Sequence, residues 1–217
     1  KRLEYRGYDS AGMATLESGE IKIRRDVGKL SRLQTLVSEQ PLSGNMGIGH
    51  TRWATHGEPN ERNAHPHMGS TGKVVLVHNG IVENYMDLRE ELIAGGVTLQ
   101  SDTDSEVIVH LVERYLAADD SFEEAVRHTI SHLSGASAMV LMSTLEPDKI
   151  MAARVGNAGG IAIGLGDGEM FVASDMPAIL EHTRNIAFLE PGWMAIVDES
   201  GYSAKTVIGE PVSSETH

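Results

Sequence analysis

The second half of the chain is built from short apolar runs that are separated by turns rather than by crossover helices. These runs lie at residues 138–142, 150–155, 160–165, 170–173, 187–189, 193–197 and 204–208. Gly166-Asp167-Gly168 and Glu199-Ser200-Gly201 are typical of the turns that connect them. Because parallel strands need crossovers of a dozen or more residues, these strands are expected to form antiparallel sheets.

The first half of the chain combines strands with helices. Strands are expected at residues 12–16, 21–25, 46–53 and 73–79, the first two joined as a hairpin. Helices are expected at residues 28–40 and 82–94 and after two capping-box motifs, Thr103-x-x-Glu106 and Ser121-x-x-Glu124. The run from Val74 to Val77 is apolar throughout, so we expect it to be buried on both faces. The pattern predicts an α+β layered domain rather than a doubly wound one.

Composition limits the partners of such a domain. The 217 residues include 18 Lys and Arg against 31 Asp and Glu, a formal net charge of −13. This charge repels phosphate backbones and anionic lipids, so neither nucleic acid nor a membrane is expected as a partner. No apolar stretch approaches the roughly 20 residues of a membrane span, and residues 1–6 do not resemble a signal peptide. A soluble cytoplasmic protein is expected.

The sequence contains no cysteine and ten histidines. Without cysteine, these residues can form no disulfide, no thiolate metal site and no cysteine nucleophile. The closest histidine groupings are His65-Pro66-His67 and the pair His50 and His56, and neither has a second ligand pair at the spacing of a zinc site. The glycines at 156–168 lie between short strands, unlike those of a phosphate-binding loop. We expect no metal and no cofactor.

The densest polar cluster lies at the end of a strand, in residues 49–59. The guanidinium of Arg52 can bind a carboxylate through two parallel hydrogen bonds, and the hydroxyl of Thr55 and the loop N–H groups add donors. Trp53 can cover a small ligand from water. The segment therefore has the features of an anion-binding loop. In an arbitrary sequence, a strand-end loop with an Arg salt bridge and a packed Trp is the commoner explanation.

Two further clusters bear groups that are useful in amide chemistry. Asn79-Gly80 follows an apolar strand and offers a side-chain amide and a flexible backbone N–H, the two donors of an oxyanion hole. The same dipeptide is a common turn. Asp104 lies among acidic residues at a helix N-terminus, where a carboxylate either caps the helix or binds a ligand ammonium.

Six sequence blocks, at residues 5–12, 50–59, 63–67, 78–84, 101–106 and 173–175, follow one another in the order and approximate spacing of a known family. The chain resembles the glutaminase domains of class II glutamine amidotransferases. The combination of YRGYDSAG with HTRWATHGEP is most similar to the domains of glutamine–fructose-6-phosphate aminotransferases, which take part in amino sugar biosynthesis. The resemblance extends from Lys1 to about Val207.

The resemblance implies an N-terminal-nucleophile hydrolase-like αββα domain with two stacked antiparallel sheets, and it implies roles for single residues. Arg52 matches the clamp on the α-carboxylate of L-glutamine, with Thr55 and His56 as substrate-binding residues of the same loop. Asp104 matches the acceptor of the glutamine ammonium. Trp53 matches the loop residue that helps to close the site and the ammonia path.

Asn79 and Gly80 match the family's oxyanion hole, but the nucleophile has no counterpart. In the family it is an N-terminal Cys on a Cys-Gly-Ile-Val-Gly strand, followed by a helix, and this sequence begins at the end of that helix. One strand and one helix amount to about 20 residues. The chain is therefore expected to be N-terminally truncated and inactive alone. We expect the domain to span residues 1–210.

The remaining residues, 211–217, are expected to be a tail or the start of a linker to sugar-isomerase domains in a homo-oligomeric parent protein. Two alternatives remain open at this point. The chain could come from another class II amidotransferase, such as an amidophosphoribosyltransferase, or it could be a non-catalytic pseudo-glutaminase that binds glutamine without hydrolysing it.

Overall fold

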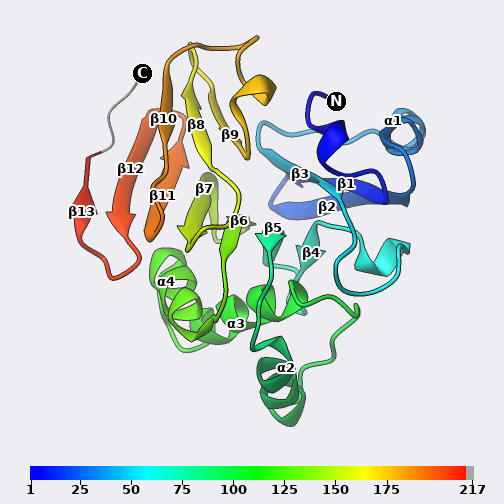
Figure 1. The fold of residues 1–217 in the computed structure, drawn as a ribbon, viewed down its shortest axis with the longest axis vertical. Coiled ribbons are helices and arrows are strands. Elements are labelled where there is room, and N and C mark those ends of the chain that lie inside the picture. The colour runs from blue at the N-terminus through cyan, green and yellow to red at the C-terminus, as the bar shows by residue number, and fades with distance from the viewer. Residues whose placement is uncertain (214–217) are drawn as a thin grey trace.

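The strands form one large antiparallel sheet and two small ones (Figure 1). The computed structural model describes residues 1–213. The large sheet consists, in spatial order, of β13 (Pro211–Val212), β12 (Gly201–Thr206), β11 (Trp193–Asp198), β7 (Glu146–Val155), β6 (Ser137–Ser143), β5 (Val74–Gly80) and β4 (His67–Met68). The first small sheet consists of β2 (Glu20–Val27), β1 (Ser10–Glu17) and β3 (Gly47–Arg52), and the second of β10 (Ile186–Phe188), β8 (Ala162–Leu165) and β9 (Met170–Ala173). All paired strands are antiparallel, as the turn-rich sequence predicts.

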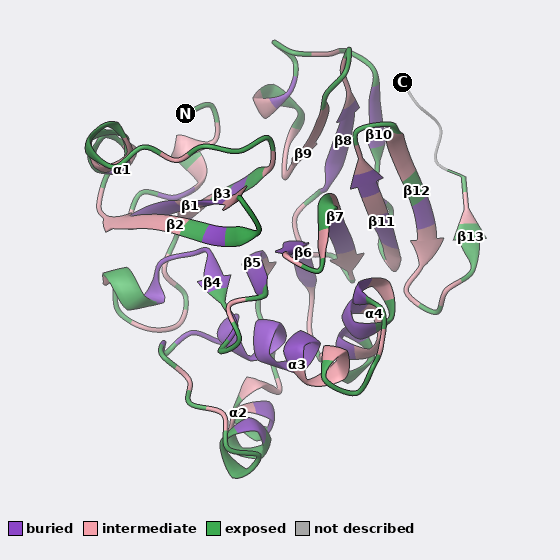
Figure 2. Ribbon diagram, turned by 180° about the vertical axis from the view of Figure 1, so that it is seen from behind, coloured by how far each residue is buried: buried purple, intermediate pink, exposed green. Residues whose placement is uncertain are grey.

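Helices enclose these sheets from both sides. On one face of the large sheet lie α2 (Tyr85–Ala94), α3 (Glu106–Leu116) and α4 (Phe122–His132), and on its other face lie the two small sheets (Figure 1, Figure 2). The outer side of the first small sheet is covered by α1 (Leu30–Glu39). The result is the αββα layering expected from the sequence. None of the helices in residues 1–213 is long and apolar enough to cross a membrane.

The position of β5 inside these layers explains its apolar sequence. Val74 and Leu76 belong to the core between the large sheet and the helices. Val75 and Val77, which point the opposite way, belong to the core between the large sheet and the first small sheet. The predicted burial of this run on both faces is confirmed, since none of the four residues is more than 8% exposed.

The expected capping box of α4 is confirmed. The hydroxyl of Ser121 accepts a hydrogen bond from the Glu124 N–H, and the Glu124 carboxylate accepts one from the Ser121 N–H at 3.1 Å. These bonds satisfy two of the backbone donors that a helix N-terminus leaves free.

The capping box predicted for Thr103 and Glu106 is wrong. The Glu106 carboxylate instead accepts the backbone N–H groups of Gln100 at 2.7 Å and Ser101 at 2.6 Å. The hydroxyl of Thr103 lies 3.1 Å from His67 Nε2. The chain before α3 therefore folds back over the first turn of the helix, and the carboxylate binds that loop rather than the cap.

Three strand predictions also differ from the structure. The polar loop expected at residues 54–72 contains β4, which pairs His67 with Leu76 of β5. The strand expected at 204–208 is β12, which begins and ends earlier. Pro211 and Val212, in the expected tail, pair with Lys205 and Ala204 of β12. Residues 214–217 of that tail lie outside the described residues.

The two small sheets are separated by a cleft. Within residues 1–213, β3 pairs only with β1, and β9 pairs only with β8. Residues of β3 and of β9 line the same cleft, which has a volume of about 770 Å³, and its floor includes Val77 of β5 and Val140 of β6. Both figures show β3 and β9 next to each other, with no strand between them (Figure 1, Figure 2).

Four histidines lie together near this cleft. His65, His67 and His78 are buried, and His50 is half-buried with its Nδ1 atom shielded from solvent. The His65 ring centroid lies 4.4 Å from that of His50 and 4.5 Å from that of His67. Burial lowers the pKa of His50 and of His78 to about 4 and that of His67 to about 3, and it lowers the pKa of His65 well below its usual value.

We expect acid to destabilise the fold through these histidines. Above pH 6.5 the imidazoles are neutral in both the folded and the unfolded state, but between about pH 6.5 and 4 only the unfolded chain takes up protons. The free energy of unfolding should therefore fall by up to about 1.4 kcal/mol per pH unit for each histidine. Urea unfolding at several pH values measures this slope.

The variant His67→Gln should reduce the slope by the contribution of one histidine, up to about 1.4 kcal/mol per pH unit. The variant His182→Gln removes an exposed imidazole and serves as the control. Glu106 adds to the slope only at the acid end of this range, below about pH 5, where its carboxyl takes up protons in the unfolded chain but not in the folded one. Burial raises its pKa, but hydrogen bonds from His110, Gln100 and Ser101 outweigh that effect and lower the pKa to about 2. An unchanged slope in His67→Gln would contradict the prediction.

Candidate active site

A pocket of about 200 Å³ forms where β3 and β5 end beside the N-terminus of α3. Six of the seven residues singled out from the sequence line it: Arg52, Trp53, Thr55, Asn79, Gly80 and Asp104. They come from three segments that are distant in the sequence. The structure thus brings the three predicted polar clusters together in one place.

Arg52 is the last residue of β3 and is 4% exposed. Its guanidinium donates to the backbone carbonyl oxygens of His56, Gly57 and Glu58, the latter two at 3.1 and 3.5 Å. Burial lowers the pKa of Arg52, and the nearby carboxylates of Asp9 and Asp104 oppose this shift. A guanidinium has five N–H donors, so the bonds to the loop leave donors for a ligand.

Asp104 is 3% exposed, and its two carboxylate oxygens have different surroundings. Oδ2 accepts the Val82 N–H at 2.8 Å, which fixes the side chain. Oδ1 lies 3.9 Å from Nδ1 of His56. Oδ2 thus binds the loop that precedes α2, whereas α3, the helix that the simpler interpretation has this carboxylate cap, has Ser105 as its N-cap and no side-chain capping bond. Oδ1 remains available to the pocket.

Gly80 ends β5 in a conformation that only glycine adopts readily. Its φ is +139°, and a Cβ atom would lie 2.1 Å from the carbonyl oxygen of Ala136. The preceding Asn79 places its Oδ1 atom 2.9 Å from Nε2 of His50. Asn79 and Gly80 still pair with β6, and the chain then enters a loop that leads to α2. The dipeptide is thus not a hairpin turn.

The loop that follows β3 holds the remaining predicted residues. The Trp53 side chain is 59% exposed, and its ring lies 5.4 Å from that of Tyr8. Thr55 lines the pocket. His56 does not line it, but lies beside Asp104 and contacts the Tyr85 ring edge-on at 5.3 Å.

Seven further residues line the pocket, and none of them is predicted from the sequence to be a site residue: Arg6, His50, Thr51, His65, His78, Thr103 and Ser105. They belong to the sequence blocks that carry the family resemblance, and this was the only available signal. Arg6 donates to the Ser174 carbonyl oxygen at 3.1 Å, which links the first block to the last. His78 contacts the hydroxyls of Ser105 at 2.8 Å and Ser137 at 3.0 Å.

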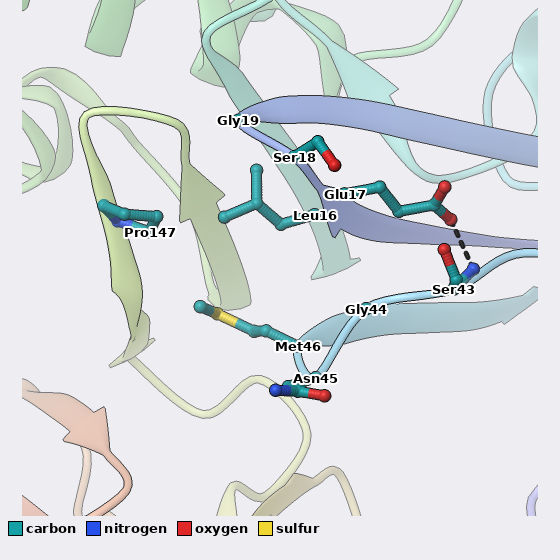
Figure 3. Close-up of a pocket in the computed structure, with 9 residues that line it drawn as sticks. All are labelled: Leu16, Glu17, Ser18, Gly19, Ser43, Gly44, Asn45, Met46 and Pro147. Atoms are coloured by element: carbon teal, nitrogen blue, oxygen red, sulfur yellow. Dashed lines mark hydrogen bonds between the residues drawn. The ribbon is translucent and has the colours of Figure 1, made fainter.

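A third hollow, of about 410 Å³, lies at the turn of the β1–β2 hairpin (Figure 3). Its carboxylate, Glu17, accepts hydrogen bonds from the Ser43 N–H and from the Thr15 hydroxyl at 2.8 Å. The backbone bond from Ser43 is the main cause of the lowered pKa of Glu17. Among the described residues, the lining of this hollow has no cationic side chain, but it includes the hydroxyls of Ser18 and Ser43.

Metal chemistry has no evident centre in the described part of the chain. No group of three or more His, Cys, Asp or Glu side chains in residues 1–213 is arranged to hold a metal ion. The histidines near the pocket instead contact hydroxyls, an amide and one another. The expectation of no metal and no cofactor stays a prediction.

Comparison with solved structures supports the expected fold. Glutamine phosphoribosylpyrophosphate amidotransferase from B. subtilis, complexed with ADP and GMP, matches 95% of this chain with a TM-score of 0.82 at 24% identity, over 44% of its own length. A glutamine aminotransferase class-II domain protein from Silicibacter pomeroyi matches 94% of this chain with a TM-score of 0.63 at 16% identity, over 97% of its own length. The N-terminal-nucleophile hydrolase-like layering is confirmed.

Comparison with curated sequences is more specific. The glutamine–fructose-6-phosphate aminotransferase (isomerizing) of Thermococcus kodakarensis is 47% identical over 218 residues, which cover 100% of this chain and 36% of the relative. The enzyme of the same name from Chlorobaculum tepidum is 49% identical over 212 residues, covering 95% of this chain and 34% of the relative. The chain thus spans about a third of the length of these relatives.

A family model described as a glutamine amidotransferase domain matches residues 37–190, which is more than half of the chain. The match includes the ends of β3 and β5 and the start of α3, where the candidate residues meet. The chain therefore belongs to the glutamine amidotransferase domain family.

Proposed function

We propose that this chain is the glutaminase domain of a glutamine–fructose-6-phosphate aminotransferase, in which it releases ammonia from L-glutamine for the amination of fructose 6-phosphate. The observation that carries the proposal is the convergence of Arg52, Asp104 and Asn79-Gly80 on one pocket. Identities of 47% and 49% to enzymes of that name favour this parent over an amidophosphoribosyltransferase, whose 24% identity indicates a shared fold only.

The proposed binding mode follows from the charges of the substrate. Glutamine carries a carboxylate and an ammonium on one carbon atom and an amide at the other end. The remaining donors of Arg52 bind the carboxylate, and Oδ1 of Asp104 accepts from the ammonium. The side-chain amide then lies toward Asn79 and Gly80, whose N–H groups face its carbonyl oxygen.

In the proposed reaction, a cysteine thiolate attacks the amide carbon and forms a carbon–sulfur bond. The negative charge that develops on the oxygen is stabilised by the N–H groups of Asn79 and Gly80. When this intermediate collapses, the carbon–nitrogen bond breaks, and the nitrogen leaves as ammonia with the proton that the thiol first gave to the free α-amine of the N-terminal cysteine. Water then cleaves the thioester, which yields glutamate and the free thiol.

We propose that the cysteine is carried by an additional strand between β3 and β9. The cleft of about 770 Å³ supports this position, because β3 and β9 each have one strand edge without a partner strand in the described residues. An unpaired edge offers backbone N–H and C=O groups to another strand. The added strand would join the two small sheets, and Asn79, which also lines this cleft, would lie at hand for its cysteine.

The rest of the parent protein follows from the same proposal. Sugar-isomerase domains that bind fructose 6-phosphate follow a linker beyond β13, and the parent is a homo-oligomer. We place it in the cytoplasm because glutamine and sugar phosphates are charged metabolites that do not cross membranes unaided. The length of the curated relatives, about three times that of this chain, supports further domains.

The 217-residue chain alone should release no ammonia from glutamine above background, because its binding groups lack a nucleophile. The protein extended by an N-terminal segment that begins Cys-Gly-Ile-Val-Gly should hydrolyse glutamine, and its Cys→Ala variant should not. A coupled ammonia assay measures both. If the extended protein folds but releases no ammonia, the non-catalytic alternative is correct.

In the extended protein, Arg52→Ala should lower kcat/KM by about 30- to 1,000-fold, mainly through KM, because a charge-assisted contact to the substrate carboxylate is lost. Arg52→Lys keeps the charge but not the planar fork, so it should recover only part of this loss. Steady-state glutaminase kinetics make the measurement. A change within threefold for Arg52→Ala would leave the residue with its structural role in the loop.

Asn79→Ala should lower kcat by about 10²- to 10³-fold with a smaller effect on KM, because an oxyanion donor acts on charge that develops during the reaction. Asp104→Asn should act mainly on KM, since the ammonium is bound in both ground and transition states. This variant retains an oxygen for the Val82 N–H, so it tests the charge without removing that hydrogen bond. Equal, small effects of both variants on both constants would contradict these roles.

A further inference from the structure

The orientation of the Asn79 side chain decides whether it can take part in an oxyanion hole. A carboxamide has an NH₂ end that donates and an oxygen end that accepts. Only the NH₂ end stabilises a negatively charged oxygen, and a reversed amide would place a second oxygen against it. Some group must therefore hold the amide in one of its two orientations.

His50 is the group that contacts the opposite end of this amide. Its Nε2 atom lies 2.9 Å from Oδ1 of Asn79. The backbone of His50 pairs with Gly12 inside the first small sheet, and its ring packs against the His65 ring at a centroid distance of 4.4 Å. A strand backbone and a neighbouring ring thus restrain the imidazole.

The surroundings of the other ring nitrogen select one tautomer. Nδ1 of His50 is shielded from solvent and has no hydrogen-bond partner among the described residues. A proton on Nε2 would donate to Oδ1 of Asn79 and leave Nδ1 as a bare acceptor. A proton on Nδ1 would instead bury an unpaired N–H donor, and Nε2 could then be satisfied only by a reversed amide. The tautomer with its proton on Nε2 is favoured because its N–H has a partner, and buried N–H donors without a partner are rare.

The ring is neutral at pH 7, so the position of a single proton matters. Burial lowers the pKa of His50 to about 4, against smaller opposing effects of Asn79 and the His78 carbonyl group. A neutral imidazole has one N–H and one acceptor nitrogen. With its proton on Nε2 the neutral ring binds only the oxygen end of an amide, and with its proton on Nδ1 it would bind only the NH₂ end.

We propose that His50 is a positioning residue for the oxyanion hole: its Nε2–H binds Oδ1 of Asn79 and directs the amide NH₂ toward the substrate. In this role His50 acts on the reaction through Asn79. The inference rests on the proposed glutaminase function for its catalytic consequence, whereas the tautomer and the hydrogen bond stand independently of turnover.

Kinetics of the extended, cysteine-containing protein test the catalytic consequence. His50→Leu should lower kcat by about 10- to 100-fold, somewhat less than loss of the Asn79 amide itself, with KM within about threefold of the parent. In an Asn79→Ala background, the same substitution should cost no more than about a further twofold, because the group that it positions is already absent. His50→Gln offers an N–H donor and should recover part of the lost kcat.

The double-mutant cycle gives clear contrary outcomes. If the losses of His50→Leu and Asn79→Ala multiply, the two residues act independently and the proposal is wrong. If His50→Leu raises KM and lowers thermal stability but leaves kcat unchanged, His50 has only a packing role.

A measurement that needs no turnover tests the hydrogen bond directly. Nitrogen NMR of histidine-labelled extended protein should show His50 as the neutral tautomer with its proton on Nε2 at pH 7. A proton on Nδ1 would overturn the proposal, even if glutaminase activity is present. Because this result does not depend on activity or on any variant that fails to fold, it separates failure of the positioning role from failure of the proposed function.

Discussion

Burial of β5 on both faces is the constraint on which the rest of the structure depends. Successive side chains of a strand point to opposite faces, so burial of residues 74–77 also fixes the faces toward which His78 and Asn79 point. His78 follows Leu76 toward the helices, where it contacts Ser105 beside α3. Asn79 follows Val77 toward the small sheets, where it contacts His50. The apolar run thus aims the polar residues at its end.

Much of this arrangement can be predicted from local sequence. The hairpin of β1 and β2, the buried run of β5 and the cap of α4 each depend on neighbouring residues, and each was expected. The two-residue strand β4 was missed because it exists only through its pairing with β5. The cap at Thr103 failed for a similar reason: Glu106 meets a stronger set of donors in the preceding loop, which local spacing does not reveal.

The candidate site shows the same division between local and tertiary information. Arg52, Asn79 and Asp104 have side chains whose chemistry is evident from residue type, and sequence blocks were enough to group them. His50 is different, because an imidazole on a strand has no evident role until its partner is known. Its contact with Asn79 joins residues from two sheets that face each other. The sequence pattern of either strand alone does not predict the contact between His50 and Asn79.

The buried charges of the site favour a zwitterionic ligand. Arg52 is nearly fully buried, and the shift of its pKa shows that burial weakens its charged form while Asp9 and Asp104 support it. Removal of either charge would leave the other buried and poorly compensated, which is costly in a protein interior. A ligand with one carboxylate and one ammonium adds no net charge and gives each buried group a partner of opposite sign. An amino acid meets this condition, whereas a simple anion would satisfy Arg52 and repel Asp104.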